Sequence, residues 1–173
     1  MKEGFTTIEL VVAISLITIM TSALMLSWNP AEKTLTLKQT SHQISQDVRR
    51  AAQLSLSAAS SSCPTFYEDY YGFGLQATAN SGTYIIYENC NQNYVWDAAS
   101  DDTLIQEVSI NEDLEISSVT PSSPLNILFV PPEPQVFINN STTSDAIITT
   151  KIINDSTTHQ IQINSRGGLQ VNQ

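Results

Sequence analysis

The feature that most constrains this chain is an uncharged apolar run close to its N-terminus. No charged residue lies between Leu10 and Leu26. The polar side chains of the run are four hydroxyls, those of Ser15, Thr18, Thr21 and Ser22. Because such hydroxyls donate to carbonyls of their own helix, an apolar environment tolerates them. A helix over residues 5–28 would be about 36 Å long, enough to cross the roughly 30 Å apolar core of a bilayer. The run therefore predicts a transmembrane helix over residues 5–28.

A cleavable secretory signal peptide is the main alternative for this run. Such a peptide ends in a cluster of small residues before a clear mature start. Here the pattern continues through Pro30 into a second helix-like segment. Signal peptides also carry their charge in front of the apolar part, whereas Glu9 lies inside it. A carboxylate at that depth costs on the order of 2.5–3.5 kcal/mol, so the sequence predicts that a partner neutralises Glu9.

The residues around Glu9 resemble a processing signature. The run Lys2-Glu3-Gly4-Phe5-Thr6-Thr7-Ile8-Glu9-Leu10 is similar to the N-terminal motif of type IV prepilins, a short charged leader ending in Gly, then Phe, Glu and a long apolar helix. The resemblance implies that prepilin peptidase cuts between Gly4 and Phe5 and that Phe5 is N-methylated. It also implies that Glu9 pairs with the N-terminal ammonium of a neighbouring subunit, which would relieve the cost of an unpaired buried carboxylate. The alternative is a Glu9 solvated by water or headgroups at the membrane edge.

The rest of the chain predicts an amphipathic helix followed by a β-rich head. One apolar helix face is marked by the spacing of Leu37, Ile44, Val48 and Ala51. Pro30 predicts a kink before this helix, which we expect over residues 29–60. Short β-branched and aromatic runs follow at 71–76, 83–89, 106–110, 114–119, 125–130, 135–138, 146–153 and 159–171. With a leader over 1–4 and a head over 61–173, the predicted fold class is α+β and pilin-like. In it, a long N-terminal helix, transmembrane in its first half, packs on an antiparallel β-sheet.

Three segments resemble the H-type minor pseudopilins of type II secretion, the GspH/FimT-like group. The matching segments are residues 47–53 on the helix, Tyr71-Gly72-Phe73-Gly74-Leu75 at the start of the sheet, and the closing Arg166-Gly167-Gly168-Leu169-Gln170-Val171. The basic C-terminal strands of the DNA-binding members are missing. Residues 60–173 hold two basic and thirteen acidic side chains, a net charge of −11. Because nucleic-acid affinity depends on Lys and Arg contacts, we expect no nucleic-acid partner.

The two cysteines and a group of aspartates are the candidate residues for a disulfide and for metal binding. An even cysteine count in an extracytoplasmic head favours a disulfide between Cys63 and Cys90, worth about 3–4 kcal/mol on the chain-entropy model. The alternative is two buried free thiols. Asp97, Asp101 and Asp102 are oxygen donors suited to calcium, but we recognise no calcium-loop spacing among them, so we predict no metal and no cofactor.

No catalytic signature is present in the sequence. It contains no GxSxG, HExxH or P-loop motif, so we expect no enzymatic activity. His42 and His159 lack nearby ligand partners in the sequence, and each is predicted to lie on the surface.

These observations predict a structural minor pseudopilin subunit of a type II secretion-like system. It would help to initiate or cap a short pseudopilus with other pilin-like subunits and would take part in protein secretion. We expect a single-pass protein of the inner membrane with its head outside the cytoplasm. The alternatives are a minor pilin of a type IV pilus or competence pseudopilus, and a membrane-anchored binding or adhesive head.

Overall fold

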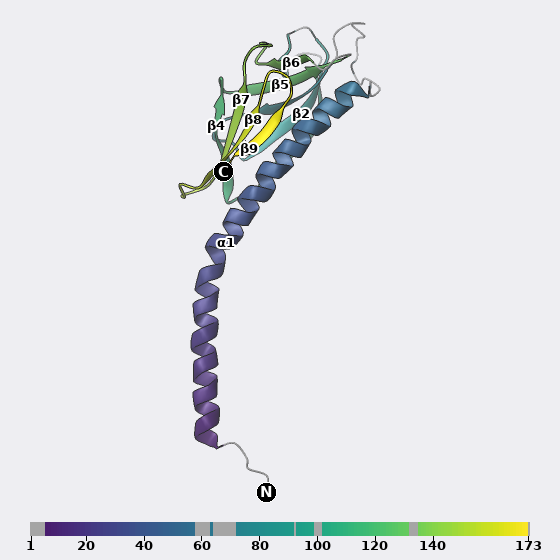
Figure 1. Cartoon of the computed structure of the whole chain (residues 1–173). Helices are drawn as coiled ribbons and strands as arrows, with labels where there is room; N and C mark the ends of the chain where they lie inside the picture. The colour runs from purple at the N-terminus through teal and green to yellow at the C-terminus, as the bar shows by residue number, and fades with distance from the viewer. Residues whose placement is uncertain are drawn as a thin grey trace. The chain divides into compact units, whose positions relative to one another are not determined.

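The computed structural model describes residues 6–57, 63, 72–91, 93–98, 102–131 and 135–172, with the backbone alone for residues 23–30. This part of the chain forms one helix, α1 (Thr7–Leu56), followed by nine strands (Figure 1). The strands are β1 Gly72–Ala77, β2 Thr83–Asn89, β3 Thr103–Ser109, β4 Leu114–Thr120, β5 Leu125–Val130, β6 Gln135–Ile138, β7 Ala146–Ile152, β8 Thr158–Ile163 and β9 Leu169–Asn172. The chain divides into two compact units, Met1–Leu35 and Thr36–Gln173.

The strands of the second unit form two antiparallel sheets. The first has the order β3-β2-β1-β5-β6 and the second the order β4-β7-β8-β9. Burial alternates along β7, as expected for a strand with one covered face. The alternation is matched across the register, where Ile148 of β7 faces Ile161 of β8.

One hydrophobic core joins both sheets to the second part of α1. The apolar helix face predicted from the sequence, which includes Ile44 and Val48, is buried in this core. Leu75 and Ile127 contribute from the first sheet, and Ile148 contributes from the second. A contiguous core of this kind is what makes the second unit a single domain.

Polar contacts also hold α1 to the first sheet. The buried hydroxyl of Ser55 donates to the backbone oxygen of Phe129 in β5 at 2.6 Å. The Tyr84 hydroxyl of β2 donates to Asp47 Oδ2 at 2.5 Å. Because bonds to a charged acceptor are the stronger kind, the second contact orients this part of the helix on its sheet.

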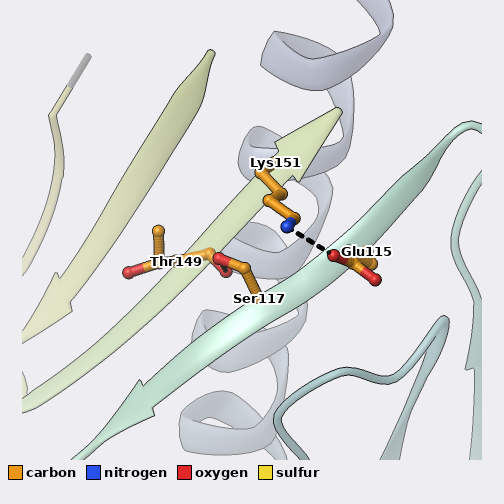
Figure 2. Close-up of polar contacts among 4 residues, drawn as sticks. All are labelled: Glu115, Ser117, Thr149 and Lys151. Atoms are coloured by element: carbon orange, nitrogen blue, oxygen red, sulfur yellow. Dashed lines mark hydrogen bonds and ion pairs between the residues drawn. The ribbon is translucent and has the colours of Figure 1, made fainter. Parts of the chain in front are cut away.

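Strand β4 at the edge of the second sheet is tied to β7 by side chains as well as backbone. Figure 2 shows the ion pair between Lys151 Nζ and Glu115 Oε1, 2.9 Å apart, whose residues also face each other in the register. The Ser117 hydroxyl donates to the Thr149 carbonyl at 3.2 Å, next to a register shift between Ile116 and Ser118. An extra residue on one strand leaves groups unpaired, and a side-chain bond of this kind compensates.

The predicted fold class is wrong. The nine strands lie in two sheets, not in one sheet behind a helix. A span needs about 20 consecutive apolar residues, and among the side chains that the structure describes, no helical stretch is both long and apolar enough to pass through a membrane. The apolar part of α1 with described side chains ends at Ser22. The pilin-like membrane anchor over residues 5–28 and the single-pass inner-membrane localisation are corrected by this finding.

Candidate assembly surface on helix α1

The first part of α1 exposes large apolar side chains on all its sides. From Ile8, which is 72 % exposed, to Met20, which is 70 % exposed, none of its large apolar side chains is covered by another described residue. We call this set the apolar helix surface; it consists of Ile8, Leu10, Val11, Val12, Ile14, Leu16, Ile17, Ile19 and Met20. At about 100° per residue these positions fall on every side of the helix. Helices that are apolar all round are normally buried, so this surface requires a partner.

The hydroxyls within the apolar helix surface are turned to the helix backbone. Ser15 donates to the Val11 carbonyl at 2.7 Å, and Thr18 donates to the Ile14 carbonyl at 2.8 Å. The hydroxyls of Thr21 and Ser22 likewise donate to the carbonyls four residues earlier, those of Ile17 and Thr18. Each hydroxyl proton is thereby used within the helix, which leaves the surface apolar in character.

Glu9 forms a capping box with Thr6 at the start of α1. Its Oε2 accepts bonds from the Thr6 backbone amide at 3.0 Å and from the Thr6 hydroxyl at 2.8 Å. The Thr6 hydroxyl in turn accepts from the Glu9 amide at 3.4 Å. Together these bonds satisfy donors that the first turn leaves open. The bonds from the Thr6 amide and hydroxyl lower the pKa of Glu9, which therefore remains a carboxylate at the helix N-terminus.

A shallow depression runs along one side of the same helix. Its walls are the apolar side chains of Ile8, Val12, Ala13 and Leu16, with Glu9 at one end. Ile8, Val12 and Leu16 are four residues apart, which places them in one row along the helix, and Ala13 lies beside that row. The depression can receive a ridge of side chains from another helix, while Glu9 supplies its single charge.

The structure brings together some of the predicted site residues. Gly4 and Phe5, the predicted cleavage and methylation residues, lie outside the described residues. Glu9 lies at the start of α1, as described above. Cys63 and Cys90 form a disulfide with Cα atoms 5.5 Å apart, and Cys90 directly follows β2. The disulfide therefore links the segment after α1 to the first sheet.

The carboxylate of Glu88 lies beside this disulfide. Its oxygen and the two sulfurs fall within 4.8 Å of one another, a spacing that can hold a metal ion. Both sulfurs are committed to the disulfide, so neither is the thiolate that a metal requires. This group does not form a metal centre in the oxidised protein.

Sequence reasoning missed two features of these sites. The capping partner Thr6 was not identified, although the spacing Thr6-x-x-Glu9 in front of an apolar run is the signal for a capping box. His159 was predicted on the surface, and this is wrong, because this residue of β8 is only 4 % exposed and lies near Lys38 and His42 of α1. No local pattern distinguishes a buried histidine of this kind.

Comparisons with protein-family models, curated proteins and solved structures gave no match for this chain.

Proposed function

We propose that the protein is a structural subunit of a helix-packed fibre, a minor pseudopilin of a type II secretion-like system. The observation that carries this proposal is the apolar helix surface, whose nine large side chains are exposed on every side of α1. A fibre built from bundled helices would cover such a surface on all sides, which a single flat partner would not.

The energetics favour association through this surface. Fully burying an aliphatic side chain of this size contributes about 1.5–3 kcal/mol. Ordering an Ile or Leu side chain costs only about 0.5–1 kcal/mol. Burying half of the nine side chains therefore leaves a net favourable free energy, which can offset the loss of translational and rotational freedom on association. Because the four hydroxyls donate to helix carbonyls, covering the surface does not leave their protons without an acceptor.

Glu9 supplies specificity in this proposal. Its carboxylate is held at the start of α1 by Thr6 and stays ionised. If the chain is cut between Gly4 and Phe5, as the sequence motif implies, each subunit gains an ammonium group four residues before Glu9. Pairing that ammonium with the Glu9 of a neighbour would fix the axial offset between subunits, because a buried charge without its partner is costly.

Site-directed cross-linking tests the proposal. The variant Leu16→Cys places a thiol in the depression of α1, and Ile153→Cys places one on an exposed apolar residue after β7. In cells that make the natural partner subunits, we expect Leu16→Cys to give adducts with other pilin-like subunits, identified by mass. Ile153→Cys should give at least about fivefold fewer, since its surroundings lack the apolar helix surface.

A second variant tests the role of Glu9. Adding Glu9→Ala to Leu16→Cys should lower the adduct yield by about tenfold, which corresponds to about 1.4 kcal/mol of lost pairing. Equal yields from Leu16→Cys and Ile153→Cys would overturn the assembly proposal. An unchanged yield with Glu9→Ala would overturn only the pairing role of the carboxylate.

A further inference from the structure

The loop after β2 gathers five oxygen atoms around one point. That point is the Nδ2 atom of Asn89, whose residue is 1 % exposed at the end of β2. The distances from it are 3.3 Å to Asn91 Oδ1, 3.2 Å to Asn93 Oδ1 and 3.2 Å to the Val95 carbonyl. Both oxygens of Asp102 complete the set, at 3.3 and 3.4 Å. One atom is thus surrounded by five oxygens from four residues at nearly equal distances.

An amide group matches this cage poorly. The Nδ2 atom of Asn89 carries two hydrogens, so it can satisfy two of the five oxygens well. All five distances also exceed the 2.9–3.0 Å, roughly, at which N–H···O bonds are most often found. The arrangement therefore offers more oxygen than an amide can use.

Backbone amides hold the oxygens in place. Asn91 Oδ1 accepts from the Asn93 amide, and Asn93 Oδ1 accepts from the Val95 amide, each at 3.0 Å. The Asp102 carboxylate accepts from the Cys90 amide at 2.9 Å and from the Asp97 amide at 3.0 Å. Asp102 Oδ1 also accepts from the side-chain amide of Asn91 at 3.1 Å, so three donors orient it. Since an acceptor oxygen has two lone pairs, Asn93 Oδ1 and Asp102 Oδ2, with one backbone donor each, keep capacity for a cation. The Cys63–Cys90 disulfide fixes the chain at the beginning of the loop.

The distances match the coordination shell of one cation size. In a pentagonal bipyramid the axial ligand lies √2 times the metal–oxygen distance from each of the five equatorial ligands. For calcium, with metal–oxygen distances of 2.3–2.6 Å, that separation is about 3.3–3.7 Å. The observed 3.2–3.4 Å agrees with the lower end of this range. Magnesium would require about 2.9 Å and an octahedron with four equatorial ligands.

The spacing of the donors along the chain points the same way. Asn91, Asn93 and Val95 occupy alternate positions, and Asp102 comes twelfth when Asn91 is counted as first. Calcium loops use alternate early positions and a bidentate acid at the twelfth. Here the loop joins β2 to β3, not two helices, so the likeness is confined to the spacing of ligands.

The electrostatics of Asp102 favour a positive partner. The Asp102 carboxylate lies close to a second acid, Asp97, and a cation beside two neighbouring carboxylates offsets their mutual repulsion. The two basic residues of the strand-rich half are engaged or distant in sequence. Lys151 pairs with Glu115 (Figure 2), and Arg166 lies in the turn between β8 and β9. A bound cation would add positive charge beside Asp97 and Asp102 in a half of the chain that carries only two basic side chains.

We propose that this loop binds one calcium ion through Asn91, Asn93, the Val95 carbonyl and a bidentate Asp102. A half-turn of the Asn89 amide would exchange Nδ2 for Oδ1 and add a sixth oxygen in the axial position. The inference does not rest on the proposed assembly function, because it concerns the loop between β2 and β3 and none of the residues of the apolar helix surface.

Calorimetric titration of the full chain with calcium chloride tests the site. We expect one site with a dissociation constant of about 10⁻³ M or tighter, and binding of magnesium at least about tenfold weaker. Calcium at a hundred times the dissociation constant should raise the midpoint of thermal unfolding, because the folded state alone presents the cage.

Three variants separate the site from general charge effects. Asp102→Asn removes the bidentate ligand and should weaken calcium binding at least about tenfold. Asn93→Ala removes one neutral ligand and serves where Asp102→Asn fails to fold, as judged by circular dichroism; we expect a loss of at least about threefold. Glu112→Gln removes an exposed carboxylate outside the loop and should bind like the wild type. No heat or thermal shift up to about 10 mM calcium, equal affinity for magnesium, or equal losses in Asp102→Asn and Glu112→Gln would overturn the proposal.

Discussion

Individual side chains in the helix–sheet contact decide how the second unit responds to its surroundings. His159 of β8 is buried with its Nδ1 atom unpartnered among the described residues, and its own carbonyl accepts from the Thr150 hydroxyl at 3.4 Å. Thr150 Oγ1 lies 3.1 Å from Ser41 Oγ of α1. Burial lowers the pKa of His159, and the positive charges of Lys38 and His42 lower it further. This imidazole therefore remains neutral in the folded protein at a pH where the unfolded chain already takes up a proton.

The sign of the resulting pH dependence follows directly. A lowered pKa in the folded state means that the stabilisation is present above about pH 6.5, the unfolded value, and is lost as the pH falls below it. We expect the free energy of unfolding, measured with urea, to be lower at pH 5 than at pH 7.5. His159→Gln should reduce this difference, whereas the variant of the exposed His42, His42→Gln, should retain most of it. Equal pH dependence in wild type and His159→Gln would contradict this assignment.

The contact between Tyr84 and Asp47 can be tested by removing one hydroxyl. Tyr84→Phe deletes the 2.5 Å bond while keeping the buried ring. Because Asp47 is partly exposed and can be rehydrated, we expect a loss of about 1–2 kcal/mol in the free energy of unfolding.

The matched control for Tyr84→Phe is Tyr94→Phe. It removes a hydroxyl but keeps the ring that stacks on Phe137 at a centroid distance of 4.3 Å. We expect Tyr94→Phe to change the free energy of unfolding by less than about 0.5 kcal/mol. A loss as large as that of Tyr84→Phe would show that the bond to Asp47 contributes nothing specific.

At the level of elements, β1 and β5 approach each other closely because β1 carries glycine. A Cβ atom on Gly74 would lie 2.7 Å from the Ile127 backbone oxygen, closer than real contacts allow. Since a backbone atom cannot move aside cheaply, Gly74→Ala should lower the free energy of unfolding by about 1–3 kcal/mol in urea denaturation. Gly82→Ala is the control, because nothing lies within 4 Å of its added Cβ, and we expect its effect to stay within about 0.5 kcal/mol. Similar losses for both variants would contradict the close-approach argument.

The strands themselves could be predicted from sequence more readily than their grouping. The run at 71–76 corresponds to β1 (Gly72–Ala77), and the run at 159–171 covers most of β8 and β9, which are joined by a turn that includes Gly167. That turn depends on Gly167, whose φ of 79° suits glycine. Local pattern does not say which strands pair, so the division into two sheets had no sequence signal. The cluster of oxygens in the β2–β3 loop likewise had no local sequence signal, because it forms only when Asn89 and Asp102, thirteen positions apart, come together in the fold.

For the whole molecule, composition predicted the exposed apolar surface of α1 but led to a wrong membrane-spanning assignment. The absence of charge between Leu10 and Leu26 is a property of the sequence, and it predicts an apolar partner for this part of α1. The identity of that partner is a tertiary or quaternary matter, and the membrane-spanning assignment built on it was wrong. The acidic character of the strand-rich half was also evident from composition. The proposed calcium site at Asp102, in contrast, is formed by the folded loop and has no signal in the composition.

The hydroxyls of α1 that donate to carbonyls of their own helix affect how two such helices can slide along each other. With Ser15, Thr18, Thr21 and Ser22 bonded to their own carbonyls, the sideways contacts carry no direction along the axis. Two such helices can shift along their axes by one turn, about 5.4 Å, and exchange one set of apolar side-chain contacts for another of similar free energy. The capped carboxylate at Glu9 then acts as the only axial stop among the described side chains between residues 6 and 22. In the proposed fibre, growth would therefore proceed in small, reversible steps that stop where the Glu9 carboxylate meets its partner.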